Sequence, residues 1–167
     1  FQLVQANELS TEDYEHYHLF KKLELGYEGW KVVRDLANEL KIELIFDIFG
    51  THSLRIAESL GIKTIKLHPT DFRNEALIEA VLNSTKINSV IAGCGGSYAN
   101  EIINTLKKFK DKKHLTLLHG FQGYPTPENE NCLNRIKTLR EIALSIGLSS
   151  FDIGFADHSA PTSINSN

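Results

Sequence analysis

Ionisable and small polar residues stand at the ends of five apolar segments of the sequence. If these segments are parallel strands, their carboxyl ends meet at one edge of a sheet, where ligands bind in α/β proteins. The pattern therefore predicts a polar site built from several loops. The five groups are Phe46-Asp47-Ile48-Phe49, Lys66-Leu67-His68, Gly93-Cys94-Gly95-Gly96, residues 119–125 and Asp157-His158-Ser159.

Lys66 lies between Ile65 and Leu67, inside an otherwise apolar segment. A buried ammonium is costly unless it is paired, so this lysine should face a polar lumen or contact a carboxylate. The alternative is a lysine at a strand edge that reaches solvent. The position of Lys66 just before His68 and Asp71, at a strand end, keeps the functional interpretation open.

His158 directly follows Asp157, close to the end of the chain. Imidazole is the commonest metal ligand, and a nearby carboxylate can orient it. One histidine is not a metal site, and a hydrogen-bonded loop histidine is the more common explanation for a histidine taken by itself. His68 and His119 are possible companions, but the sequence does not show that they converge.

The glycine-rich segment 93–96 precedes a predicted helix. Small residues let the backbone approach an anion, and a helix N-terminus offers free N–H groups. The segment lacks the Lys-Ser/Thr of a P-loop, and a tight turn between strand and helix is an equal alternative. Cys94 has no evident histidine partner, which does not favour a nucleophile.

Alternating strands and helices must position these groups. The alternation predicts a parallel sheet with crossover helices, either a doubly wound open sheet or part of a (β/α)8 barrel. Gly61 and Gly147 are expected to end two of the helices. Strands are predicted at residues 41–49, 64–68, 89–92, 114–119 and 151–155, with a possible one at 1–5, and helices at 28–40, 53–60, 75–82, 99–108 and 133–146.

Composition narrows the class of protein. The 167 residues are 41% hydrophobic and carry a net charge of −3, which is typical of a soluble globular domain and argues against nucleic-acid binding by charge. No apolar run approaches the roughly 20 residues of a membrane span. Two cysteines fit a reducing compartment, so a cytoplasmic protein is expected, and the lysines between positions 107 and 113 should be solvated. Because the sequence has no Met, we expect a piece of a longer chain.

Several segments, in order along the chain, resemble one known family: the N-acetylneuraminate (sialic acid) synthases and their relatives that make legionaminic and pseudaminic acids. The order and spacing of the matches hold over nearly the whole sequence. The matching segments are Phe1-Gln2 with 17–25, 48–53 with 60–66, Leu117-Leu118-His119 with Tyr124-Pro125-Thr126-Pro127 and 133–139, and 153–158.

The resemblance implies a (β/α)8 TIM barrel. Residues 1–167 would hold only its strands 2 to 7, truncated at both ends and without the family's C-terminal antifreeze-like domain. The implied activity is condensation of phosphoenolpyruvate with an N-acylated hexosamine, such as N-acetylmannosamine, to a nonulosonic acid. Mn²⁺ or Mg²⁺ assists this reaction, and phosphate is released. The resemblance also implies a homodimer in the full-length protein, with no nucleic-acid or membrane partner.

The resemblance assigns roles to eight residues. Lys66 would bind phosphoenolpyruvate, and Asp71 stands where the family has a catalytic glutamate. His158 matches the metal-binding histidine. The implied substrate-binding residues are Gln2, Phe49, Gly93, Gln122 and Tyr124.

Four hydroxyl side chains of the family pattern are missing. Asp47 stands where a threonine binds phosphoenolpyruvate, and Pro69, Gly93 and Ala156 replace serines. Loss of one buried hydrogen bond to a charged group costs roughly 1.5–3 kcal/mol, so weaker phosphate binding is expected. Three hypotheses follow: a divergent synthase, a non-catalytic sugar-binding module, and a barrel enzyme that uses a less anionic donor.

Overall fold

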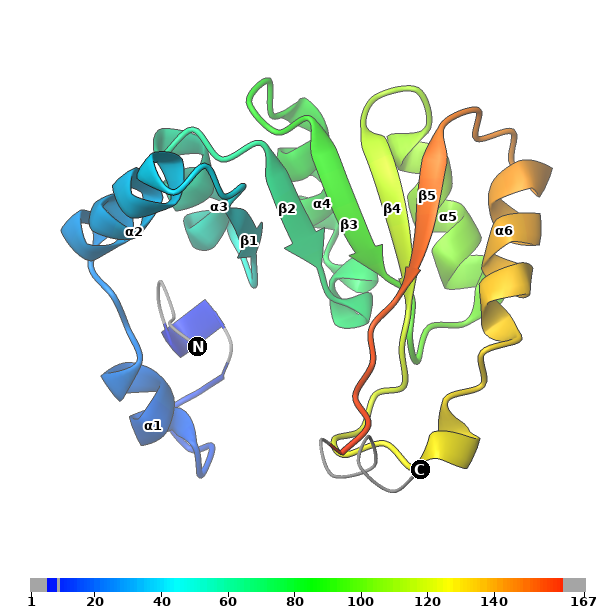
Figure 1. Cartoon of the computed structure of the whole chain (residues 1–167), viewed down its shortest axis with the longest axis horizontal. Coiled ribbons are helices and arrows are strands. Elements are labelled where there is room, and N and C mark those ends of the chain that lie inside the picture. The colour runs from blue at the N-terminus through cyan, green and yellow to red at the C-terminus, as the bar shows by residue number, and fades with distance from the viewer. Residues whose placement is uncertain (1–5, 9, 161–167) are drawn as a thin grey trace.

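A computed structural model describes residues 6–8 and 10–160 of the chain. Five parallel strands form one sheet whose spatial order, β1-β2-β3-β4-β5, is also their order along the chain (Figure 1). The protein is therefore of the α/β class. The strands are β1 (Ile45–Asp47), β2 (Thr64–Leu67), β3 (Ser89–Gly93), β4 (His114–His119) and β5 (Phe151–Phe155).

A helix follows each of the first four strands. Figure 1 shows that α4 and α5 lie behind the sheet and that α6 lies beside β5. Along the described chain, no helix is long and apolar enough to cross a membrane. The helices are α1 (Tyr17–Lys22), α2 (Tyr27–Glu39), α3 (Thr51–Ser59), α4 (Glu75–Asn83), α5 (Ala99–Phe109) and α6 (Arg135–Ser145), and the short 3-10 segments are η1 (Ala6–Glu8), η2 (Pro69–Arg73) and η3 (Glu128–Glu130).

The hydrophobic core lies between the sheet and these helices. Alternate residues of a strand point to opposite faces, and one set, which includes Ile65, Val90 and Leu115, is fully buried. Leu77 of α4 and Leu106 of α5 are buried in the same core. Burial of this face fixes the register, because a shift of one residue would move its apolar side chains to the opposite face.

The opposite face of the sheet is partly exposed and carries charged residues. The strand register places one row across all five strands: Asp47, Lys66, Ile91, Thr116 and Asp152. Each of these residues is partly or fully exposed. Parallel sheets are normally covered on both faces, so this face resembles the lining of a barrel wall more than the outside of a finished sheet.

Strands β1 and β5 are the two edges, so the described residues form an open sheet. The expected helices and five of the expected strands are present, and Gly61 and Gly147 adopt positive φ at the ends of α3 and α6. Strand β1 is shorter than predicted and covers only Ile45–Asp47 of the apolar run 41–49. Among the residues that the structure describes, this strand pairs on one side only, with β2. The possible strand at residues 1–5 lies outside the described residues.

Candidate active site at the carboxyl ends of the strands

Lys66 has a carboxylate partner on the neighbouring strand. Its Nζ donates a hydrogen bond of 2.7 Å to Oδ2 of Asp47, which is its register partner on β1. Nε2 of His68, two residues beyond Lys66, lies 2.8 Å from the other oxygen, Oδ1, of Asp47. Of the two interpretations of Lys66, the paired lysine is therefore the correct one. We call these residues the Asp47–Lys66–His68 cluster.

The cluster keeps Asp47 charged. Burial by itself would raise the pKa of Asp47, but the hydrogen bonds from His68 and Lys66 outweigh it and lower the pKa below the ordinary value of 3.8. A carboxylate that is charged at neutral pH offsets the positive charge of Lys66. The lysine is thus less available to an anionic ligand than an unpaired lysine would be.

Phe49 and Asp71 hold His68 from two further elements. The ring of Phe49, which follows β1, stacks on the imidazole with centroids 4.8 Å apart and planes at 22°. The carboxylate of Asp71, in η2, accepts the backbone N–H of His68 at 2.7 Å. Asp71 is buried, and this burial raises its pKa, although the bond from His68 acts in the opposite direction. In the structure, the predicted catalytic carboxylate thus fixes the backbone of His68.

The glycine-rich segment forms a close contact between two loops. A Cβ on Gly95 would overlap the carbonyl oxygen of Gly120, which follows β4. A Cβ on Gly93 would lie 3.0 Å from the carbonyl oxygen of Leu67 and 3.1 Å from the ring of Pro69. Close backbone approach therefore accounts for these glycines, as the tight-turn interpretation expects.

A cavity of about 290 Å³ opens beside this turn, where the loops after β2, β3 and β4 meet. Gln122, a predicted substrate-binding residue, lines it. Arg73 also lines it, and its guanidinium is 2.7 Å from the carboxylate of Glu101. The lining residues are Pro69, Thr70, Arg73, Gly95, Gly96, Ser97, Glu101 and Gln122.

His158 and Tyr124 lie together beyond β4 and β5. Nδ1 of His158 lies 2.8 Å from the carbonyl oxygen of Phe121, which fixes the proton on Nδ1 and leaves Nε2 as an acceptor. The ring of Tyr124 meets the imidazole edge-on at 6.5 Å and is 75% exposed. A histidine whose second nitrogen contacts a backbone carbonyl has the arrangement of a metal ligand.

The described residues do not complete a metal centre. Within them, no three His, Cys, Asp or Glu side chains lie close enough together to hold an ion. The two possible companions have partners of their own. His119 is buried, with Nε2 2.7 Å from the carbonyl oxygen of Asn131, and His68 contacts Asp47. Sequence reasoning therefore found a histidine with suitable local geometry but no set of ligands.

Cys94 and Gln2 are two further residues that the sequence singles out. Cys94 is buried, and burial raises the pKa of its thiol to about 12, so it is not an activated nucleophile. Gln2, a predicted substrate-binding residue, lies outside the described residues, and its role stays a prediction.

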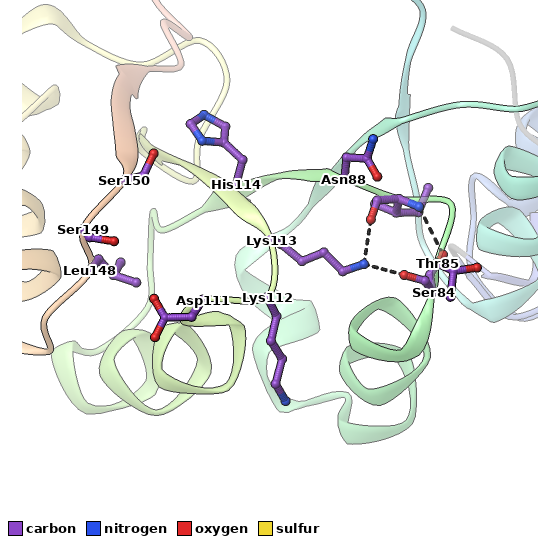
Figure 2. A pocket seen from close by; sticks show the side chains of 11 residues that line it. Ser84, Thr85, Asn88, Asp111, Lys112, Lys113, His114, Leu148, Ser149 and Ser150 are labelled. Carbon is purple, nitrogen blue, oxygen red and sulfur yellow. Dashed lines mark hydrogen bonds between the residues drawn. The ribbon is translucent and has the colours of Figure 1, made fainter.

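A second cavity, of about 540 Å³, lies at the opposite end of the sheet (Figure 2). Lys113 was expected in solvent, but its Nζ donates to the carbonyl oxygens of Ser84 and Ile87, the latter at 2.6 Å. These bonds hold the turn before β3, so Lys113 has a structural role. Ligands of parallel α/β folds bind at the carboxyl ends of strands, which favours the first cavity and the cluster beside it.

The sequence profile of the NeuB family matches residues 2–166. The chain belongs to the NeuB family. This membership confirms the resemblance inferred from the motifs.

Individual NeuB relatives agree with this assignment. The chain is 29% identical to the N,N'-diacetyllegionaminic acid synthase of Legionella pneumophila over 160 residues, which cover 92% of this chain and 44% of the relative. It is 28% identical to an uncharacterized protein of Methanocaldococcus jannaschii, over 95% of this chain and 45% of that protein. The chain thus spans less than half the length of these relatives.

A solved structure shows the same fold. The N-acetylneuraminic acid (sialic acid) synthetase of Leptospira borgpetersenii, crystallised in complex with citrate, superposes with a TM-score of 0.82 at 28% identity. The superposition covers 95% of this chain and 53% of that one. The five-stranded parallel sheet is therefore a NeuB-family architecture, and closure into a full barrel stays a prediction.

Proposed function

We propose that this NeuB-family chain serves a sialic-acid-synthase-like condensation of phosphoenolpyruvate with an N-acylated hexosamine. The products would be a nonulosonic acid and inorganic phosphate. The match of the family profile over residues 2–166 carries the proposal. The cluster and the cavity at the carboxyl ends of the strands support it, because they put Lys66 and Gln122 where this class of fold binds its ligands.

In this reaction the methylene carbon of phosphoenolpyruvate attacks the aldehyde carbon of the open-chain sugar. Water then adds to the central carbon of the donor, and phosphate leaves. Lys66 would offset the negative charge of the donor, as positioned cations do in sites that exclude water. Phe49 and Tyr124 would give the sugar apolar surfaces, and Tyr124 is exposed enough to contact it directly.

We propose that a divalent ion, Mn²⁺ or Mg²⁺, takes His158 as one of its ligands. When bound, such an ion polarises a carbonyl oxygen as a Lewis acid. Nε2 of His158 is the atom that would face it, because Nδ1 contacts the carbonyl oxygen of Phe121. The described residues do not supply a full ligand set for this ion.

A second candidate function is condensation with a less anionic donor. The ion pair between Lys66 and Asp47 favours it, since the pair places a carboxylate where a phosphate would need a free cation. The hydroxyl side chains missing from the family pattern point in the same direction.

Release of inorganic phosphate tests the proposal. The intact protein would receive Mn²⁺, phosphoenolpyruvate and N-acetylmannosamine or its 6-phosphate. We expect release that requires the sugar and falls at least about 10-fold in His158→Ala. His114→Ala is the matched control, because His114 lies on β4 at the opposite end of the sheet and should leave release unchanged.

Folded wild-type protein that releases no phosphate with either sugar would overturn the proposed reaction. Condensation of the same sugars with a 2-oxo acid that carries no phosphate group would then support the second candidate. Metal affinity measured by calorimetry gives an independent readout, which should fall in His158→Ala whatever the donor is.

A further inference from the structure

We propose that His68 is an acid–base catalytic residue of this site and that Asp47 is its positioning residue. The inference rests on the proposed function and names a group that transfers protons within it. Neither residue owes this role to the resemblance, in which Asp47 is a departure and His68 has no part.

Two side chains contact the imidazole of His68, and a third holds its backbone. Asp47 on β1 lies 2.8 Å from Nε2, and Phe49, beyond the same strand, stacks on the ring. Asp71 in η2 binds the backbone N–H of His68. A histidine that only filled space would not need a carboxylate, a stacked ring and a backbone anchor together. Such restraint is the preorganisation that proton transfer requires.

The carboxylate also decides which nitrogen reacts. Nε2 is buried 2.8 Å from Oδ1 of Asp47, in a contact that lacks hydrogen-bond geometry, and this leaves Nδ1 as the ring nitrogen that a ligand can reach. Within the described part of the chain, Nδ1 has no hydrogen-bond partner, and the side chain of His68 is 30% exposed. Nδ1 is therefore open to a ligand at the carboxyl end of the sheet.

Three charged side chains lie around His68. Asp47 contacts its imidazole and also pairs with Lys66, which stands two residues earlier on β2, and Asp71 accepts the backbone N–H of His68. One carboxylate that contacts both Lys66 and His68 holds the two side chains next to each other. This arrangement also explains Asp47, which would otherwise only repel an anionic donor.

The proton steps balance over one turnover. As the new C–C bond forms, imidazolium gives its Nδ1 proton to the aldehyde oxygen, which becomes a hydroxyl. Water then adds to the central carbon of the donor and gives one proton back to Nδ1. The resulting hydroxyl collapses to the keto group, the C–O bond to phosphate breaks, and the second proton of the water leaves on phosphate as hydrogen phosphate.

Chemical rescue tests this role. In the intact protein with Mn²⁺, phosphoenolpyruvate and N-acetylmannosamine, His68→Ala should lower kcat at least about 100-fold and change the KM for phosphoenolpyruvate little. Added imidazole should restore at least a tenth of the lost rate. His68→Ala should also remove one limb of the pH–rate profile. Asp47→Asn should lower kcat less, about 10-fold, and should shift that limb along the pH axis.

His114→Ala is the matched control. His114 also contacts an aspartate on the neighbouring strand, with Nε2 3.0 Å from Oδ2 of Asp152, but at the other end of the sheet. It should keep its activity and gain nothing from imidazole. Circular dichroism checks folding, and His68→Gln repeats the pH profile if His68→Ala does not fold.

The outcomes separate the two proposals. An inactive, folded wild type overturns the proposed reaction and this role with it. An active wild type whose folded His68→Ala variant keeps its rate, or loses the rate without rescue by imidazole, overturns the role of His68 alone.

Discussion

At the scale of single residues, Asp47 determines how the candidate site behaves. Its two carboxylate oxygens contact two different side chains, Lys66 through Nζ at 2.7 Å and His68 through Nε2 at 2.8 Å. In the sequence, Asp47 replaces a threonine of the family pattern, so that a hydroxyl is lost and a negative charge stands near the anionic phosphoenolpyruvate. Seen in the structure, it is the residue that brings a lysine and a histidine together. The residue that departs from the family pattern therefore has two partners of its own in the site.

The pairing of Asp47 predicts a pH-dependent contribution to stability. The pKa of Asp47 is lowered on folding, so its carboxylate stabilises the fold above the ordinary pKa of 3.8, and this contribution is lost as the pH falls through the lower folded value. Asp47→Asn should reduce the free energy of unfolding by up to about 1 kcal/mol at pH 7, because the side chain is partly exposed, and by less near pH 3. Urea unfolding across this range measures the difference.

Asp35→Asn is the control for this measurement. Asp35 pairs with its neighbour Arg34 at an exposed position of α2, so its replacement should change stability little at any pH. A loss in Asp47→Asn that is the same at pH 3 and pH 7 would contradict the pairing.

The sequence predicted residue types better than residue partners. Lys66 was expected either in solvent or paired, and no spacing rule identifies Asp47, which becomes its partner through the register of two parallel strands. The carboxylate of Glu8 accepts the backbone N–H groups of His52 and Ser53 at the start of α3. A cap supplied by such a distant residue has no local signature in the sequence.

At the scale of elements, a close backbone contact joins the loops after β3 and β4. Gly95 and Gly120 touch through their backbones, and a side chain on Gly95 has no space. This contact forms one wall of the cavity that Gln122 lines. The position of the predicted substrate-binding residue thus depends on a glycine in the neighbouring loop.

Gly95→Ala should therefore destabilise the protein by about 3 kcal/mol or more, since the new Cβ meets rigid backbone instead of a flexible side chain. Thermal unfolding measures the effect. Gly26→Ala is the control, because a Cβ on Gly26, which precedes α2, meets nothing within 4 Å. Equal unfolding temperatures for the two variants would show that the loops do not touch as described.

Regular elements were predictable because their periodicity is local. The segments 114–119 and 151–155 are strands with the predicted bounds, and α5 extends one residue beyond its prediction. The strand predicted over the apolar run 41–49 was too long, because hydrophobicity does not reveal where hydrogen-bonded pairing with β2 stops. Closure of the sheet is a property of the whole assembly, and no single segment encodes it.

At the scale of the whole molecule, the sheet formed by residues 6–8 and 10–160 has two edges. Within this part of the chain β1 and β5 each have one neighbour, and apolar side chains near the β1 edge are exposed, among them Leu36, Leu40 and Ile45. Unpaired edges with apolar surface promote association between chains.

The 167-residue chain alone should therefore self-associate. Light scattering after size-exclusion chromatography should show a mass that rises with concentration, and Ile45→Lys should reduce this rise, because a charged residue blunts an edge strand. Tyr98→Lys is the control, since Tyr98 is also exposed but follows the central strand β3. A concentration-independent monomer with a cooperative thermal transition would refute this expectation.

The strand order has a consequence for how the chain is made. From β2 onward, each strand pairs with the strand that precedes it in the sequence. When a strand leaves the ribosome, its pairing partner has therefore already been synthesised. Domains commonly fold from the N-terminus during synthesis, and contacts between adjacent units require only short loop closures. The sheet can thus grow by accretion, one strand and one helix at a time. The site at the carboxyl ends of the strands forms in the same order, from the N-terminal strand onward. Its first contacts are those of Asp47 with Lys66 and His68.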